Sequence, residues 1–218
     1  QYCEDFYAIP CPDANLQQQF GGRFNLVFTG TFTPAQSLDT VIRAVAKARA
    51  NGASQLHLLL VGDGMSRSEL EQLVRQLDAG PFVTFYGSVP AREVPRFTTL
   101  ADALLISLSD SPDLGLTVPA KLASYMAAGK PVVASMDGAG ADAVRAAGCG
   151  VVSDACDVDA LAQNLVTLCA MSADRRAELG RCAKVYYLEN YRRSILLRRL
   201  ESFVLGGSLS ESPAEVRS

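Results

Sequence analysis

The sequence predicts an α/β fold, with a doubly wound, mostly parallel sheet and helices on both faces. Short runs that are apolar throughout alternate with segments of helical periodicity, and the first three runs end at a glycine. Parallel strands that are covered on both faces read as continuous apolar runs. We expect six strands, over residues 24–29, 56–61, 82–86, 103–108, 131–134 and 150–153.

Helices are expected between these strands. Residues 36–50 place Leu38, Val41, Ile42 and Val45 at helical spacing. Such strand and helix units in alternation predict a Rossmann-like sheet. The other predicted helices cover residues 66–77, where Ser66 and Glu69 have the form of a capping box, and residues 93–100, 119–128, 140–147 and 158–170.

The two ends of the chain differ from the central array over residues 23–171. Residues 1–22 hold two prolines and two glycines and are interpreted as an irregular lead-in. Residues 172–205 are rich in arginine and tyrosine and predict two further helices. Residues 206–218 are small and polar, which is typical of a disordered tail.

Composition argues against several classes of function. The chain has 218 residues and a formal net charge of −3, whereas a nucleic-acid binder usually shows a basic excess. No apolar run approaches the roughly 20 residues that span a bilayer, and we expect no signal segment. The six cysteines form no C-x-x-C pair, so free thiols in a reducing cytosol are expected.

The sequence offers few catalytic or metal-binding side chains. Its single histidine, His57, lies in a predicted buried strand and is interpreted as a core residue rather than a base. This argues against a Ser-His-Asp or Cys-His site. Asp110 and Asp113 are the only close acidic pair at the expected ligand edge, so no metal site is predicted.

Ligands of doubly wound sheets bind where the strands end. After the first strand, Gly30 lets a ligand approach the backbone, and Thr31 and Thr33 supply hydroxyl donors. The following helix points its N-terminus at this loop, which favours an anion. An ordinary strand-to-helix turn is the alternative interpretation.

The loop before the helix at 119–128 gives the clearest signal for an anion. The backbone N–H groups of Leu116, Thr117 and Val118 can form an anion nest there. Lys121 lies in the first turn of the helix, where a cation opposes the helix dipole unless an anion meets it. We therefore predict that Lys121 is a phosphate ligand.

Two more loops at this edge leave alternatives open. In residues 62–67, Arg67 either reaches a phosphate or lies on a solvated helix face. In residues 137–141, Gly138 and Gly140 either contact a sugar or phosphate or cap the following helix. The dinucleotide signature G-x-G-x-x-G is absent, so a dehydrogenase-like or flavodoxin-like binder is the least favoured class.

Four segments together carry a family resemblance: VFTGTFTPAQSLDT (27–40), LHLLLVGDGM (56–65), VTFYGSV (83–89) and TVPAKLASYMAAGKPVVASMDGAGAD (117–142). Their order and spacing resemble the C-terminal domain of family-four retaining glycosyltransferases, over about residues 20–205. The fucosaminyltransferase-like branch of bacterial polysaccharide biosynthesis is the most similar. The opening QYCEDFYAIP resembles the inter-domain linker of that family.

The resemblance implies one half of a GT-B fold, in which two Rossmann-like domains face each other across a cleft. Residues 23–171 would bind the nucleotide sugar, a UDP-sugar, without a metal or other cofactor. Residues 172–205 would pack back towards an N-terminal domain or partner subunit that carries the acceptor site and the catalytic histidine. No catalytic residue is therefore expected in this chain, and the acceptor is expected to be a lipid-linked saccharide.

The resemblance also implies a cytoplasmic location, with peripheral contact to the inner face of the membrane as one option. Site roles carry over by position. Ser124 stands where many relatives have a ribose-binding glutamate, and Ala139 stands where a glutamate commonly precedes Gly140. The expected donor site comprises the pyrophosphate loop (Gly30, Thr31, Thr33, Gln36), Arg67, the base frame (Tyr86, Gly87, Val89), the diphosphate loop (Leu116, Thr117, Val118, Lys121), Ser124, Gly138 and Gly140.

Two rival hypotheses remain. The chain can be a non-catalytic half-glycosyltransferase that needs a partner chain, which predicts an exposed apolar surface around Tyr186, Tyr187 and Tyr191. It can also be a sugar-nucleotide epimerase-like domain, although such enzymes need carboxylates and histidines that this sequence largely lacks at the cleft.

Overall fold

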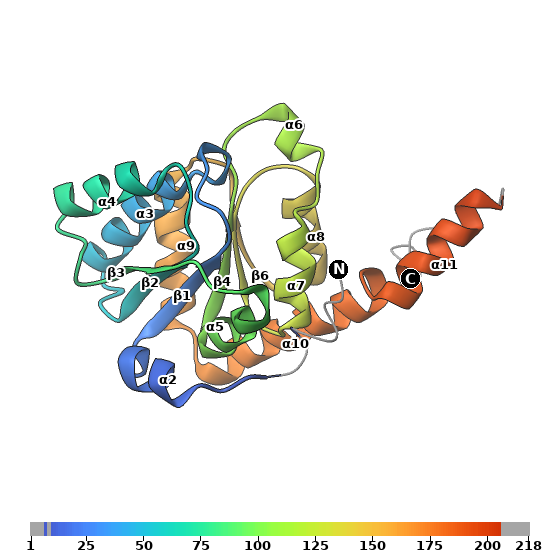
Figure 1. Cartoon of the computed structure of the whole chain (residues 1–218), viewed down its shortest axis with the longest axis horizontal. Helices are drawn as coiled ribbons and strands as arrows, with labels where there is room; N and C mark the ends of the chain where they lie inside the picture. Colours follow the sequence, from blue (N-terminus) through green and yellow to red (C-terminus); the bar gives the residue numbers. More distant parts are fainter. Residues whose placement is uncertain (1–6, 8–9, 206–218) are drawn as a thin grey trace.

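The computed structural model describes residue 7 and residues 10–205, and its centre is one parallel sheet (Figure 1). The order of the six strands is β3-β2-β1-β4-β5-β6. This order confirms the predicted doubly wound fold, because the connections run in opposite directions on the two sides of the β1–β4 boundary. The strands are β1 (Phe24–Thr29), β2 (Leu56–Val61), β3 (Val83–Gly87), β4 (Ala103–Ser107), β5 (Val132–Ser135) and β6 (Gly150–Ser153).

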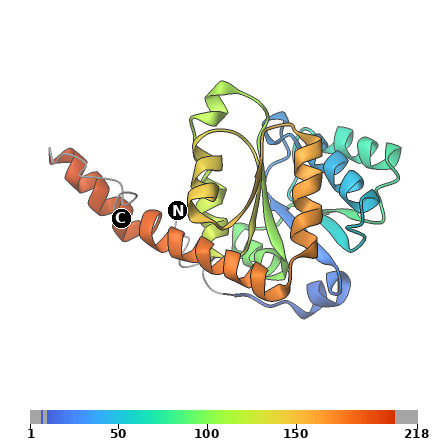
Figure 2. The ribbon, with the colours of Figure 1, turned by 180° about the vertical axis from the view of Figure 1, so that it is seen from behind.

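Helices cover both faces of the sheet, as Figures 1 and 2 show from opposite sides. The helices α3 (Leu38–Ala50), α4 (Arg67–Gln76) and α9 (Val158–Ala170) lie on one face. The other face is covered by α5 (Val94–Leu100), α7 (Ala120–Ala127) and α8 (Ala139–Ala147).

Alternate residues of one strand supply the two cores. In β1, Leu26 and Phe28 pack with the α3 side, whereas Val27 packs with the α7 side, and all three are fully buried. This is the physical reason for the uninterrupted apolar runs in the sequence. Short helical turns complete the connections: η1 (Pro34–Gln36), η2 (Ala91–Glu93) and α6 (Pro112–Gly115).

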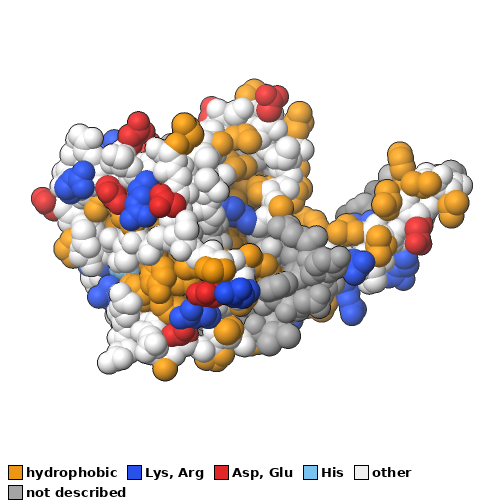
Figure 3. Space-filling view, viewed as in Figure 1, with side chains coloured by type: hydrophobic (Ala, Val, Ile, Leu, Met, Phe, Trp, Pro, Cys, Tyr) orange, Lys and Arg blue, Asp and Glu red, His pale blue; other side chains and the backbone are white. Residues whose placement is uncertain are grey.

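The two C-terminal helices predicted from the sequence are α10 (Ala173–Asn190) and α11 (Arg193–Val204). Helix α10 packs against α7 and α8, whereas α11 extends away from the body (Figure 2). No residue of α11 is buried. Its surface carries hydrophobic side chains beside cationic ones (Figure 3), and the exposed apolar residues are Leu196, Leu197, Leu200, Phe203 and Val204.

The apolar surface expected around the three C-terminal tyrosines is wrong in one respect. Tyr187 is only 1% exposed and belongs to the core on the α7 side. Tyr186 and Tyr191 are half-buried and stack edge-on, with ring centroids 5.8 Å apart. Val185 and Leu188 of α10 are exposed instead.

The expectation of an irregular lead-in is wrong for residues 14–20, which form α2 (Ala14–Phe20). Asp13 caps this helix, since its carboxylate accepts the N–H of Leu16 at 2.9 Å. Leu16 and Phe20 are four residues apart and fully buried against the sheet side of α5. A helix of only about two turns is too short to show a helical periodicity in the sequence. Residues 1–6, 8–9 and the predicted tail at 206–218 lie outside the described residues.

The predicted capping box at Ser66 is also wrong. Ser66 has helical backbone angles (φ −81°, ψ −4°) and its side chain makes no capping bond. A capping side chain needs an extended backbone at that residue to reach the helix N–H groups. The tight turn at Gly64 sets the Ser66 conformation instead, because the N–H of Arg67 bonds the Gly64 carbonyl at 3.1 Å.

Five cysteines lie in the described part of the chain, and all have free thiols: Cys11, Cys149, Cys156, Cys169 and Cys182. Within that same part, none of the helices combines the length and the apolar character that crossing a membrane requires.

Candidate functional site

A cavity of about 400 Å³ opens at the carboxyl ends of β1, β2 and β3. It lies beside the β1–β4 boundary, where doubly wound sheets bind their ligands. Five of the predicted site residues line it, namely Gly30, Thr31, Val89, Lys121 and Ser124. The remaining lining residues are Tyr7, Thr29, Val61, Gly62, Asp63, Ser88, Ala91, Val94 and Tyr125.

The ends of β1 and β2 approach each other closely at this cavity. Gly30 and Gly62 both have positive φ, at 142° and 146°. A Cβ atom on Gly62 would lie 1.8 Å from the Gly30 carbonyl oxygen, so only glycine fits. The close contact leaves the backbone of both loops accessible from the cavity side.

Lys121 reaches this cavity from the first turn of α7. Its ammonium donates a hydrogen bond to Gln36 Oε1 at 2.8 Å and lies 3.9 Å from the centre of the Phe28 ring. A Cβ built on Gly30 would be 3.1 Å from Lys121 Nζ, so the ammonium sits directly beside the end of β1. The structure therefore brings the predicted cation and the predicted glycine loop together.

The charge of Lys121 has no opposite charge beside it. Within the described residues, no carboxylate forms an ion pair with this ammonium, whose hydrogen-bond partner Gln36 is neutral. Burial lowers the pKa of Lys121 from 10.5 to about 8. Among the described residues this half-buried ammonium has no counter-charge, which is costly in the free protein, and an anion in the cavity would offset that cost.

Tyr125 follows Lys121 by one helical turn and was not predicted from the sequence. Its hydroxyl accepts the backbone N–H of Thr29 at 2.9 Å and lies 3.1 Å from Thr29 Oγ1. The side chain is 1% exposed, and burial raises the pKa of Tyr125 to about 12. Its position four residues after Lys121 is the one signal that could have indicated it, since such residues share a helix face.

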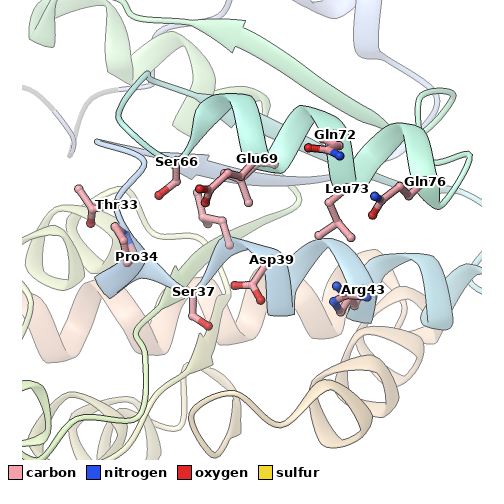
Figure 4. Close-up of a pocket in the computed structure, with 12 residues that line it drawn as sticks. Thr33, Pro34, Ser37, Asp39, Arg43, Ser66, Glu69, Gln72, Leu73 and Gln76 are labelled. Carbon is pink, nitrogen blue, oxygen red and sulfur yellow. The ribbon is translucent and has the colours of Figure 1, made fainter.

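Thr33 and Gln36, the other members of the predicted pyrophosphate loop, lie at different places in the structure. Gln36 contacts Lys121, as described, but Thr33 lines a different groove of about 410 Å³ between α3 and α4. Figure 4 shows polar side chains of both helices pointing into that groove. The buried Phe32 lies between Thr31 and Thr33 in the chain and turns the loop away from the cavity.

Arg67 is held at the protein surface by two carboxylates. Its guanidinium pairs with Glu71 at 2.8 Å and with Asp63 at 3.2 Å. The hydrogen bond that Arg67 donates to Glu71 is the largest cause that raises the pKa of Arg67. These contacts favour the surface interpretation of Arg67 over the phosphate-binding one.

The predicted base frame lies at the end of β3. Val89 lines the cavity, and the carbonyl of Gly87 (φ 97°) accepts the N–H of Gly62 at 2.9 Å. Tyr86 packs edge-on against Phe97, with ring centroids 4.6 Å apart, and remains 38% exposed. The hydrogen bond between Gly62 and Gly87 thus fixes the start of the loop that carries Val89 relative to the end of β2.

The predicted anion nest before α7 is partly occupied by the loop itself. The N–H and the hydroxyl of Thr117 both donate to the Leu114 carbonyl, at 3.1 and 2.9 Å. The side chains of Leu116 and Val118 are exposed and do not line the cavity. Helix α7 begins after Pro119, which has no side-chain group that could cap it.

Gly138 and Gly140 meet protein neighbours closely. A Cβ on Gly138 (φ 72°) would lie 2.0 Å from the Gly115 carbonyl oxygen. A Cβ on Gly140 would be 3.0 Å from atoms of Met136 and Pro119. Gly138 is also the N-cap residue of α8, so packing and capping already account for both glycines.

His57 is a core residue, as predicted. It is 1% exposed, and its ring stacks on Phe20 at a centroid distance of 5.4 Å. Nδ1 lies 3.1 Å from Asn25 Oδ1, and Nε2 lies 3.0 Å from Thr84 Oγ1. Asn25 uses its Nδ2 to donate to Phe20, so its Oδ1 accepts from a neutral histidine protonated at Nδ1.

Comparison with known families decides the classification. The model described as "Glycosyl transferases group 1" matches residues 23–171. The chain belongs to this family. Together with the cavity at the sheet edge, membership makes this chain the nucleotide-sugar donor-binding domain of a group 1 glycosyl transferase.

Curated relatives are mycobacterial glycosyl transferases. The chain is 27% identical over 211 residues to the GDP-mannose-dependent alpha-(1-6)-phosphatidylinositol monomannoside mannosyltransferase of Mycobacterium tuberculosis, covering 92% of this chain and 53% of that protein. The Mycolicibacterium smegmatis enzyme of the same name is 28% identical over 84% of this chain and 49% of its own length. The chain thus spans about half the length of the curated relatives it matches.

Solved glycosyl transferases share the fold. HepE from Anabaena in complex with UDP superposes with a TM-score of 0.76 at 20% identity, over 88% of this chain and 52% of that one. The C-terminal domain of the group 1 glycosyl transferase LpcC from Francisella tularensis gives a TM-score of 0.68 at 16% identity. That match covers 87% of this chain and 98% of the LpcC domain, so the fold is that of one GT-B half.

Proposed function

We propose that this chain binds the diphosphate of a nucleotide sugar in the cavity between Gly30 and Lys121, as the donor half of a retaining glycosyltransferase. The single observation that supports this is the half-buried Lys121 ammonium, which faces the end of β1 and, among the described residues, has a neutral amide and no carboxylate as its hydrogen-bond partner. During transfer, the leaving diphosphate gains negative charge. A cation already fixed beside it stabilises that charge without reorganisation.

The base of the donor is the finer part of this proposal. The family resemblance implies a UDP-sugar, and the fold is shared with HepE, which was solved with UDP. A GDP-sugar is the second candidate, because the relatives with 27–28% identity are named for GDP-mannose. Ser88, Val89 and Val94 also line the cavity, and the base would lie against them.

The remaining parts of the enzyme lie outside this chain in the proposal. An N-terminal domain or partner subunit would supply the acceptor site and the catalytic histidine, since His57 is committed to the core. The apolar side of α11 would pack against that domain. The acceptor would be a lipid-linked saccharide of surface polysaccharide assembly at the cytoplasmic face of the membrane, in keeping with the lipid acceptor named for the relatives.

Calorimetry with the 218-residue chain tests the donor proposal. We expect saturable binding of UDP or GDP, with ADP as the comparison that reports base selectivity. The stronger of UDP and GDP identifies the donor base. The proposal is contradicted if none of the three nucleotides binds at millimolar concentration while circular dichroism shows a folded chain.

A non-catalytic half-glycosyltransferase that acts with a partner chain is the second candidate function. The unburied apolar side of α11 favours it. Both functions predict donor binding, and both predict sugar transfer once the complementary half is present. They are separated by whether that half is encoded in the same polypeptide or in a separate chain. An epimerase-like domain has no specific support among the described residues.

A further inference from the structure

Helix α7 contacts the β1 loop at two successive turns of one face. Lys121 bonds Gln36 on η1, and Tyr125, four residues later, bonds Thr29 at the last position of β1. In the sequence, Thr29 and Gln36 lie on either side of Gly30, whose backbone lines the cavity. The loop that would receive a diphosphate is thus fixed from the same helix that carries the cation.

The Tyr125 hydroxyl is the more specific of these two contacts. It meets the N–H of Thr29 at 2.9 Å and its Oγ1 at 3.1 Å, across 96 residues of sequence. Thr29 stands at the carboxyl end of β1, next to Gly30, whose own N–H bonds the Val61 carbonyl at 2.9 Å. The hydroxyl therefore sets where β1 stops and where the Gly30 loop begins.

Packing alone does not require a hydroxyl at this position. Tyr125 is fully buried, and a phenylalanine would fill the same ring volume without a polar group to desolvate. Tyr125 and its hydrogen-bond partner Thr29 both line the cavity, together with Ser124. The bond of the Tyr125 hydroxyl joins the two elements that hold the diphosphate in the proposed function.

We propose that Tyr125 is a positioning residue for donor binding, which holds the Thr29–Gly30 backbone at a fixed distance from the Lys121 ammonium. This inference rests on the proposed function. A diphosphate contacts both sides of this arrangement, whereas a monophosphate contacts only part of it. Preorganisation of the loop then contributes more to diphosphate affinity than to monophosphate affinity.

Tyr125→Phe tests this inference, with Tyr187→Phe as the matched control. Tyr187 is also a 1% exposed tyrosine in the same core, but it lies on α10 and does not line the cavity. Affinities for UDP, UMP, GDP and GMP are measured by calorimetry on both variants and the wild-type chain. Thermal unfolding is recorded in parallel.

We expect Tyr125→Phe to lower affinity for the diphosphate by about fivefold, the effect of one neutral hydrogen bond. The ratio of diphosphate to monophosphate affinity should fall as well, whereas Tyr187→Phe leaves both unchanged. A purely structural hydroxyl would lower thermal stability and keep the ratio, and that result overturns the inference. If the wild-type chain binds none of the four nucleotides, the proposed function fails first; binding with an unaltered ratio removes only the role of Tyr125.

Discussion

The ammonium of Lys121 and the side-chain oxygen of Gln36 lie 2.8 Å apart at the carboxyl edge of the sheet. The pair joins α7 to the turn after β1, across 85 residues of sequence. Because the amide is neutral, the bond orients the ammonium without cancelling its charge. The site keeps an attraction for a negatively charged ligand even while the lysine has a hydrogen-bond partner.

Replacing this lysine should weaken nucleotide binding without loss of stability. Lys121→Met removes a charged hydrogen-bond donor, so affinity for the preferred nucleoside diphosphate should fall roughly 10- to 100-fold. The free chain should unfold at the same or a higher denaturant concentration, because the change removes a half-buried cation that has no ion-pair partner among the described residues.

Lys130→Met is the control for this change. Lys130 is also a half-buried lysine, but it lies at the opposite edge of the sheet and donates to the carbonyls of Thr99 and Ala101, at 2.9 and 2.7 Å. The Lys130→Met variant should be less stable than the wild-type chain and should keep its nucleotide affinity. Equal affinities of Lys121→Met and wild type would contradict the role of Lys121.

Nucleotide affinity should fall as the pH rises from 7 to 9.5. The pKa of Lys121 is lowered by burial to about 8, so the free protein loses this positive charge above that pH. A bound diphosphate favours the charged form, and binding then has to take up a proton. Calorimetry across this range should show the decline in the wild-type chain and a flat profile in Lys121→Met. A parallel decline in both would assign the effect to another group.

Gly62→Ala should destabilise the fold strongly. The new Cβ would lie 1.8 Å from the Gly30 carbonyl oxygen, in a residue with φ of 146°. We expect a loss of about 2–4 kcal/mol in the free energy of unfolding. Gly52→Ala separates the two causes, since Gly52 also has positive φ (106°) but no neighbour within 4 Å. It should cost about 1 kcal/mol, measured by urea unfolding of both variants.

His57 should make the fold sensitive to acid. Burial, and then the charges of Arg23 and Arg49, lower the pKa of His57 from 6.5 to about 4. Between these values the unfolded state binds more protons, so stability falls as the pH drops from 6.5 to 4. The full effect is about 3 kcal/mol. The difference in unfolding free energy between wild type and His57→Gln should change over this window and stay constant above pH 7.

The sheet was predictable because its strands are buried on both faces. The bounds of β1, β2 and β6 are those expected from the apolar runs, and α9 begins and ends where its periodicity does. Helix α2 was missed because only Leu16 and Phe20 of its seven residues are buried. The conformation of Ser66 depends on the turn before it, which a motif match does not describe.

Part of the candidate site was expected where local chemistry conflicts with local structure. The lysine in the first turn of a helix and the glycine after the first strand were both expected at the ligand edge, and Lys121 and Gly30 line one cavity there. Tyr125 could not be predicted, because its partner Thr29 is 96 residues away and neither residue is unusual in its own segment. The sequence did not show that Thr33 lines a different groove from Thr31, because the direction of a loop depends on which side chain it buries.

Helix α11 has 12 residues and buries none of them. Helices of this length are marginal in water when nothing packs against them, so its hydrogen bonds open at little cost in free energy. Amide protons of Leu196 and Leu200 should therefore exchange with solvent far faster than those of Ala183 in α10. Any molecule that covers the apolar side of α11 would slow that exchange, which makes this helix a direct readout of assembly.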